Sequence, residues 1–135
     1  MRQQQIAPTT WLWTVGAASA LVWGLIALVA ASLGPVQYVP RIFFSYRLEH
    51  FLAFYAITIL AAVGLPGTRL TFIGASMVAL AATLELIRTV IPPHQSSTMR
   101  DYSADVGGVI AAVLPIIVGR FRNLAIESAD AAKSG

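Results

Sequence analysis

Acidic, basic and histidine side chains gather in the segment 85–108 of this chain. It reads ELIRTVIPPHQSSTMRDYSADVGG and holds one glutamate, two aspartates, two arginines and one histidine. The segment begins inside one apolar stretch, crosses a short polar loop and ends inside the next. Because ionisable groups set into hydrophobic segments are costly, they usually pair with one another and mark a functional site. This segment is therefore the first candidate for such a site.

The same kinds of side chain recur near the start of the preceding apolar stretch. The full set of candidate residues is Arg47, Glu49, His50, Glu85, Arg88, His94, Arg100, Asp101, Asp105 and Gly108. A histidine with two or three carboxylates could do general acid–base work. The same groups could instead bind a polar ligand, or pair with one another and fix the packing of the helices.

The composition predicts that these residues belong to a membrane protein. Of 135 residues, 57% are hydrophobic and 11% charged, against about 45–50% and about 25% in soluble domains. Such a chain cannot cover a globular surface with polar groups, so its expected surroundings are a lipid bilayer. The absence of cysteine excludes disulfides, thiolate metal sites and cysteine nucleophiles. The net charge of +3 is scattered, without a basic run that would indicate nucleic-acid binding.

Four apolar segments follow a polar start and are each long enough to cross a bilayer as a helix. The first has 23 residues without an ionisable side chain, and about 20 are sufficient. A secretory signal peptide is the alternative, but its apolar region would be about 7–15 residues long, with a more basic start. The polar start covers residues 1–10, and a polar tail covers 120–135. The four spans cover 11–33, 42–65, 70–91 and 101–119.

These segments predict an all-α fold, a four-helix up-down transmembrane bundle formed by one domain, 11–119. Pro115 is expected to kink the last span, and the tail to be frayed or loosely helical. In an up-down bundle the start of span two, the end of span three and the start of span four lie at one membrane face. The candidate residues should therefore converge there.

The distribution of basic residues predicts the orientation of the bundle. The side of the termini would hold Arg2, Arg69, Arg120, Arg122 and Lys133, and the opposite side Arg41, Arg47, Arg88 and Arg100. Three of the latter four lie within or beside the acidic clusters, where pairing can fix them. The bias toward the cytoplasm then predicts cytoplasmic termini and a charged cluster at the outer interface.

Helical spacing indicates which candidates share a face. Glu85 and Arg88 are three residues apart and can pair. Asp101, Asp105, Gly108 and Ala112 follow one stripe, and its small residues would allow close contact with another helix. Glu49 is rotated by about 100° from His50, so the two are expected to point in different directions.

Some of these residues also suit a purely structural role. Arginines near helix ends often extend to the headgroups, and aspartates in a first turn cap a helix, which favours this interpretation for Arg47, Arg100 and Asp101. Glu85 and Asp105 lie one to two turns inside their segments, where a charge costs up to ~2.5–3.5 kcal/mol. For these two and His50 a functional or network role is the better interpretation.

Two motifs resemble those of the VanZ-like family of small membrane proteins. The first is a basic residue with a histidine three positions on and an aromatic residue just after, here Arg47, His50 and Phe51. The second reads here as Glu85, Arg88, a loop with His94 or Arg100 as its basic residue, then Asp101, Asp105 and Gly108. The resemblance covers about residues 40 to 115, and the first span fits by position only.

The chain departs from the family pattern at three positions. Tyr46 stands where the family often has aspartate, Arg88 where it has glutamine and Asp105 where it has asparagine, which puts any particular ligand chemistry in doubt. The resemblance implies an envelope-associated protein of the bacterial inner membrane, linked in the named case to resistance to the glycopeptide teicoplanin. It implies a class of protein and no reaction.

Three functions follow as hypotheses. The first is an accessory or binding protein that holds a lipid headgroup or peptidoglycan precursor at the outer interface. The second is an enzyme acting on a lipid-linked substrate, although no nucleophile elbow or HExxH motif is present. The third is a structural charge network. No cofactor is expected, and no metal is assigned, although His50, Glu85 and Asp101 are a conceivable donor set.

Overall fold

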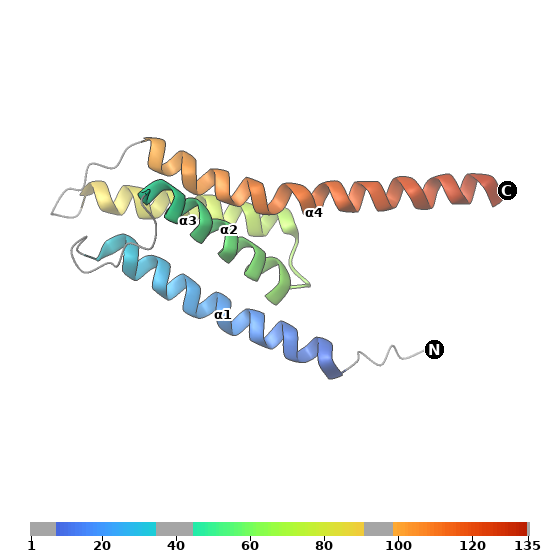
Figure 1. The fold of residues 1–135 in the computed structure, drawn as a ribbon, viewed down its shortest axis with the longest axis horizontal. Helices are drawn as coiled ribbons and strands as arrows, with labels where there is room; N and C mark the ends of the chain where they lie inside the picture. The colour runs from blue at the N-terminus through green and yellow to red at the C-terminus, as the bar shows by residue number, and fades with distance from the viewer. Residues whose placement is uncertain (1–7, 35–44, 91–98, 135) are drawn as a thin grey trace.

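Four α-helices make up this protein in a computed structural model that describes residues 8–34, 45–90 and 99–134. They are α1 (Pro8–Leu33), α2 (Tyr46–Gly64), α3 (Leu70–Val90) and α4 (Met99–Ser134), shown in Figure 1. All four are long and apolar enough to cross a membrane. The prediction of an all-α, four-helix transmembrane bundle is thereby confirmed, and we treat the chain as a multi-pass membrane protein.

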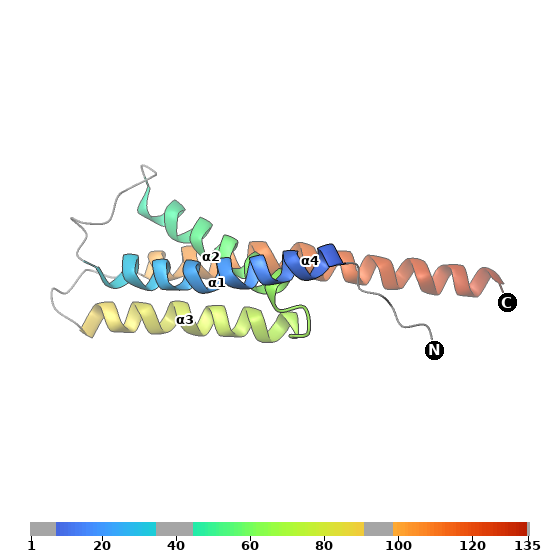
Figure 2. The ribbon, with the colours of Figure 1, turned by 90° about the horizontal axis from the view of Figure 1, so that it is seen from below.

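The C-terminal end of α4 differs from the prediction. The last span was expected to end at 119 and a loosely helical tail to follow, but one continuous helix passes through Pro115 and reaches Ser134. Figures 1 and 2 show this part projecting beyond the other helices. Hydropathy falls after 119, but alanine, leucine, arginine and glutamate in the tail are good helix formers, so the helix continues without packing partners.

The apolar stripes of the helices form a core centred on α2. Its buried face carries His50, Phe54, Ile57, Thr58 and Ala61, which recur at the three- and four-residue spacing of one helix face. The inner face of α3 has the same spacing, from Leu70 to Arg88. Large apolar side chains on the outer faces, such as Trp23, Phe72 and Leu86, are exposed, as suits contact with lipid.

Two glycines bring α2 close to its neighbours. A Cβ atom on Gly108 of α4 would overlap the carbonyl oxygen of Phe51 and lie 3.1 Å from the backbone nitrogen of Tyr55. A Cβ atom on Gly64, at the other end of α2, would lie 2.8 Å from the backbone nitrogen of Ala18 in α1. The expected close contact along the stripe of small residues on α4 is confirmed.

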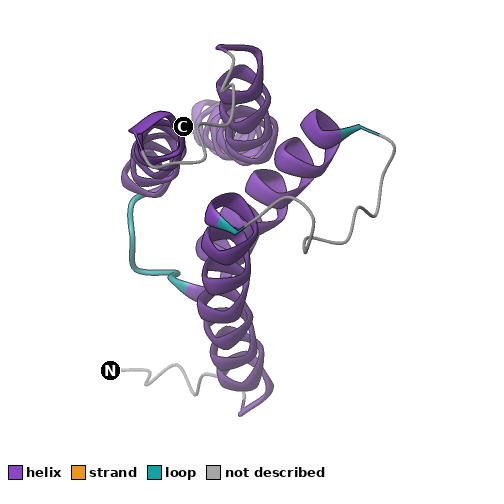
Figure 3. Ribbon diagram, turned by 90° about the vertical axis from the view of Figure 1, so that its left-hand side faces the viewer, coloured by secondary structure: helices purple, strands orange, loops and turns teal. Residues whose placement is uncertain are grey.

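The up-down order brings the candidate residues to one end of the bundle. The starts of α2 and α4 and the end of α3 lie together there, whereas the start of α1 and the end of α4 lie at the opposite end (Figures 1 and 2). Figure 3 looks onto the first of these ends. We call it the charged end, because Arg47, Glu85 and Asp101 lie there.

Substituting Gly108 tests the close contact between α2 and α4. Gly108→Ala should lower the free energy of unfolding by about 1–3 kcal/mol, the usual cost of overpacking, because the new methyl group meets backbone rather than a flexible side chain. Gly119→Ala is the matched control on the same helix, since a Cβ atom there meets nothing within 4 Å. The control should be neutral or gain up to about 1 kcal/mol of helix propensity. Unfolding in detergent, followed by circular dichroism, measures both, and equal stabilities would contradict the contact.

Candidate functional site

The central contact of the charged end joins His50 of α2 to Asp105 of α4. The Nδ1 atom of His50 lies 2.9 Å from Oδ1 of Asp105, and the two side chains are 11% and 4% exposed. His50 directly precedes Phe51, and Asp105 lies three residues before Gly108. The close approach of Gly108 to the backbone of Phe51 therefore also brings this pair together. The two residues, for which a functional or network role was predicted, thus form a contact between α2 and α4.

A second set of contacts links α3 to this pair through an aromatic ring. Glu85 and Arg88 form the predicted pair, with Oε2 and Nη1 3.6 Å apart. The guanidinium carbon of Arg88 lies 5.2 Å from the ring centroid of Tyr46, within the range of a cation–π contact. The Tyr46 and His50 ring centroids are 4.3 Å apart. Tyr46 therefore connects the pair on α3 with the pair between α2 and α4.

Tyr46 was missed as a site residue by the sequence-based prediction. It was noted only as a departure from a family pattern, although it lies four residues before His50 and therefore on the same helix face. That spacing was the available signal. We call Tyr46, His50, Glu85, Arg88 and Asp105 the inner network.

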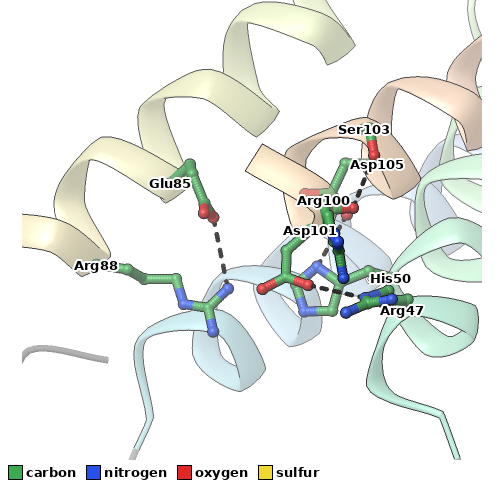
Figure 4. A network of polar contacts seen from close by, with 8 residues as sticks. All are labelled: Arg47, His50, Glu85, Arg88, Arg100, Asp101, Ser103 and Asp105. Carbon is green, nitrogen blue, oxygen red and sulfur yellow. Dashed lines mark hydrogen bonds and ion pairs between the residues drawn. The ribbon is translucent and has the colours of Figure 1, made fainter. Parts of the chain in front are cut away.

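A more exposed pair lies at the edge of the inner network (Figure 4). The Nε atom of Arg47 is 3.6 Å from Oδ1 of Asp101, and the two side chains are 55% and 13% exposed. This separation exceeds the usual 2.7–3.2 Å of an N–H···O hydrogen bond. We call Arg47 and Asp101 the rim pair.

The remaining predicted residues have different positions. Glu49 lines a groove between α1 and α2, which His50 also lines. Arg100 is exposed in the first turn of α4, where its carbonyl oxygen accepts a hydrogen bond from Oγ of Ser103 at 2.8 Å. Gly108 serves helix packing, and His94 lies outside the described residues.

One carboxylate oxygen of the inner network has no hydrogen-bond donor among the described residues. Oε1 of Glu85 is buried and has no hydrogen-bond partner within the described ranges. A buried acceptor left unsatisfied costs about 1–3 kcal/mol. A ligand or water that donates a hydrogen bond at this atom would remove that cost.

The described residues do not assemble a metal site. No three histidine, cysteine, aspartate or glutamate side chains among them are placed to hold a metal ion together. His50, Glu85 and Asp101, the set considered from the sequence, therefore do not form a donor set in this part of the chain. The carboxylates pair instead with arginine and histidine.

Comparisons with known proteins do not show which family the chain belongs to. No model of a known protein family matches the chain, and no curated protein or solved structure matches it either. The resemblance to the VanZ-like family stays a prediction.

Two substitutions of Asp105 separate its hydrogen bond from its charge. Asp105→Ala should lower the free energy of unfolding by about 1–3 kcal/mol, because it leaves the His50 ring nitrogen buried without its partner. Asp105→Asn should cost much less, since an amide can accept from or donate to that nitrogen in either tautomer. Glu127→Ala, at an exposed position of α4, is the control and should leave stability unchanged. Thermal unfolding in detergent is the measurement, and equal losses for alanine and asparagine would contradict this role.

Proposed function

We propose that this chain is a VanZ-like, envelope-associated accessory protein that binds the polar headgroup of an amphiphilic envelope ligand at the charged end. The ligand class is a lipid headgroup or a lipid-linked peptidoglycan precursor, which share a phosphate. With the termini in the cytoplasm, as the basic-residue bias predicts, the charged end faces the outer leaflet. The observation that carries the proposal is a buried, paired inner network beside a loosely paired, exposed arginine.

The inner network and the rim pair differ in how readily their residues can exchange one partner for another. His50 and Asp105 are held 2.9 Å apart and buried, so separating them would leave two polar groups unsatisfied. Arg47 is more than half exposed and 3.6 Å from Asp101, and such surface pairs contribute only about 0–1 kcal/mol. An anionic phosphate can therefore replace Asp101 as the partner of Arg47 at small cost.

The chemistry of the rim suits a phosphate ligand. A guanidinium group donates two parallel hydrogen bonds to a phosphate, and such charge-assisted bonds are roughly twice as strong as neutral ones. The exposed Arg100, next to Asp101 in the sequence, adds a second positive charge in the same turn.

Substituting the rim arginine tests headgroup binding. Arg47→Gln should raise the apparent Kd about tenfold, since 1.4 kcal/mol is tenfold in affinity and a charge-assisted hydrogen bond is worth that much. Native mass spectrometry of the detergent-solubilised chain, titrated separately with phosphatidylglycerol and with undecaprenyl-diphosphate-linked peptidoglycan precursor, distinguishes the two sources of phosphate. Arg122→Gln, on the exposed part of α4, is the matched control. Equal affinities for wild type and Arg47→Gln would overturn the proposal.

The contact between His50 and Asp105 favours one second candidate, an enzyme acting on a lipid-linked substrate. An aspartate that holds Nδ1 of a histidine fixes the ring, and leaves Nε2 to exchange a proton with a substrate or water. His50 also lines the groove beside α1, where a lipid-linked substrate could approach it. In this candidate His50 is the general base.

Phosphate release from lipid-linked diphosphates decides between the binding protein and the enzyme. The enzyme hypothesis expects turnover by the wild-type chain and a loss of about 10²–10⁴-fold in His50→Gln, the usual contribution of a general base. The loss in His50→Gln excludes a contaminating phosphatase, whose activity would not depend on the variant. Turnover that survives in Arg122→Gln shows that the loss is specific to His50. A wild-type preparation without phosphate release above the protein-free background contradicts the enzyme hypothesis.

A further inference from the structure

A groove of about 360 Å³ runs between α1 and α2 and opens beside the inner network. Its wall includes several small residues, Gly24, Ala27 and Ala31 of α1 and Ala53 and Ala56 of α2. One end is polar and carries Ser32, Tyr46, Glu49 and His50. The groove is thus apolar along its length and polar at the charged end.

The packing of α1 on α2 explains why this space remains. The two helices meet backbone to backbone where Gly64 contacts Ala18, at the end of the bundle away from the charges. A Cβ atom on Gly24 would still lie only 3.5 Å from the side chain of Ile57. Beyond this point toward the charged end, the small side chains of Ala31 and Ala53 leave space between α1 and α2.

Ser32 provides an independent indication of a ligand. Its side chain is buried at 3% exposure, and its Oγ atom has no hydrogen-bond partner within the described part of the chain. Other hydroxyl groups in the helices behave differently: Thr58 and Thr83 donate to the carbonyl oxygen four residues earlier, at 2.6 and 2.8 Å. A buried hydroxyl without a partner is costly, and a ligand in the groove would satisfy it.

We propose that the groove holds one acyl chain of a membrane glycerophospholipid, with its ester group at Ser32. Both α1 and α2 are candidate membrane spans, so the groove is immersed in a solvent of acyl chains. The order of groups along the groove, first apolar and then hydrogen-bonding, matches an acyl chain followed by its ester. The hydroxyl of Ser32 donates to the ester carbonyl, and the headgroup emerges at the charged end.

This inference concerns the acyl chain and does not require the headgroup preference proposed above. Binding of any diacyl phospholipid in the groove would satisfy it, whatever the affinity of Arg47 for a phosphate. The two proposals can therefore fail independently. Titration with lipids tests the headgroup proposal, whereas retention of a phospholipid and labelling from its acyl chain test the groove proposal.

Retention of a co-purified lipid tests the groove. The full chain is reconstituted with phosphatidylethanolamine and phosphatidylglycerol, extracted in detergent and examined by native mass spectrometry. We expect one phospholipid on the wild-type chain and its loss in Ala27→Phe, which fills the groove. Ala30→Phe is the matched control, because Ala30 is exposed on the same helix and does not line the groove. Equal retention by the two phenylalanine variants would overturn the proposal.

Two further measurements keep the result independent of folding. Ser32→Ala removes only one oxygen atom and should weaken retention about fivefold, as expected for one hydrogen bond. A phospholipid with a diazirine in its acyl chain, photolysed in the same vesicles, should label residues 27–31 and 53–56 more strongly than the exposed outer face of α3. Labelling without this preference, a retained isoprenoid in place of a phospholipid, or a dimer that occupies the groove would each contradict the proposal.

Discussion

The approach of Gly108 to the backbone of α2 sets the distance at which the polar groups of the charged end meet. Without a side chain at this position, α4 lies against the carbonyl oxygen of Phe51, and His50 reaches Asp105 one turn away. A larger residue would separate the two helices and leave both polar groups buried without each other. Glycine at this point therefore matters for electrostatics as well as for packing, since a bilayer offers no water to satisfy the separated pair.

The inner network keeps charge inside a membrane bundle by balancing it locally. Arg88 is 8% exposed and contacts both a carboxylate and an aromatic ring, so its charge is neutralised by two different kinds of partner. This arrangement supports the hypothesis of a structural charge network in part, because paired groups on α2, α3 and α4 can specify how those helices pack. The rim pair differs in exposure: the Arg47 side chain is 55% exposed, against 8% for Arg88, and such surface pairs contribute little to stability. The buried pairs therefore connect the helices, whereas the side chain of Arg47 is largely free of the packed core.

Much of the architecture could be predicted from the sequence, because hydropathy and topology decide it. The four spans follow from uninterrupted apolar runs, and the meeting of His50, Glu85 and Asp105 at one end follows from up-down order alone. Tyr46 could not be recognised in this way, since an aromatic residue at the start of a span fits an interface position as well as a network. The length of α4 was missed for another reason. A fall in hydropathy indicates where the membrane-spanning part ends, but it does not indicate where the helix ends. The groove beside α1 depends on side-chain sizes of two helices together, which no single segment reveals.

The unbroken course of α4 joins the charged end to the opposite end of the molecule. The same helix that carries Asp101 and Asp105 at the charged end continues through the bundle to Ser134, and residues 120–134 extend it by roughly 20 Å at 1.5 Å per residue. The charged end and the exposed far end of α4 therefore belong to one continuous helix, with no loop between them.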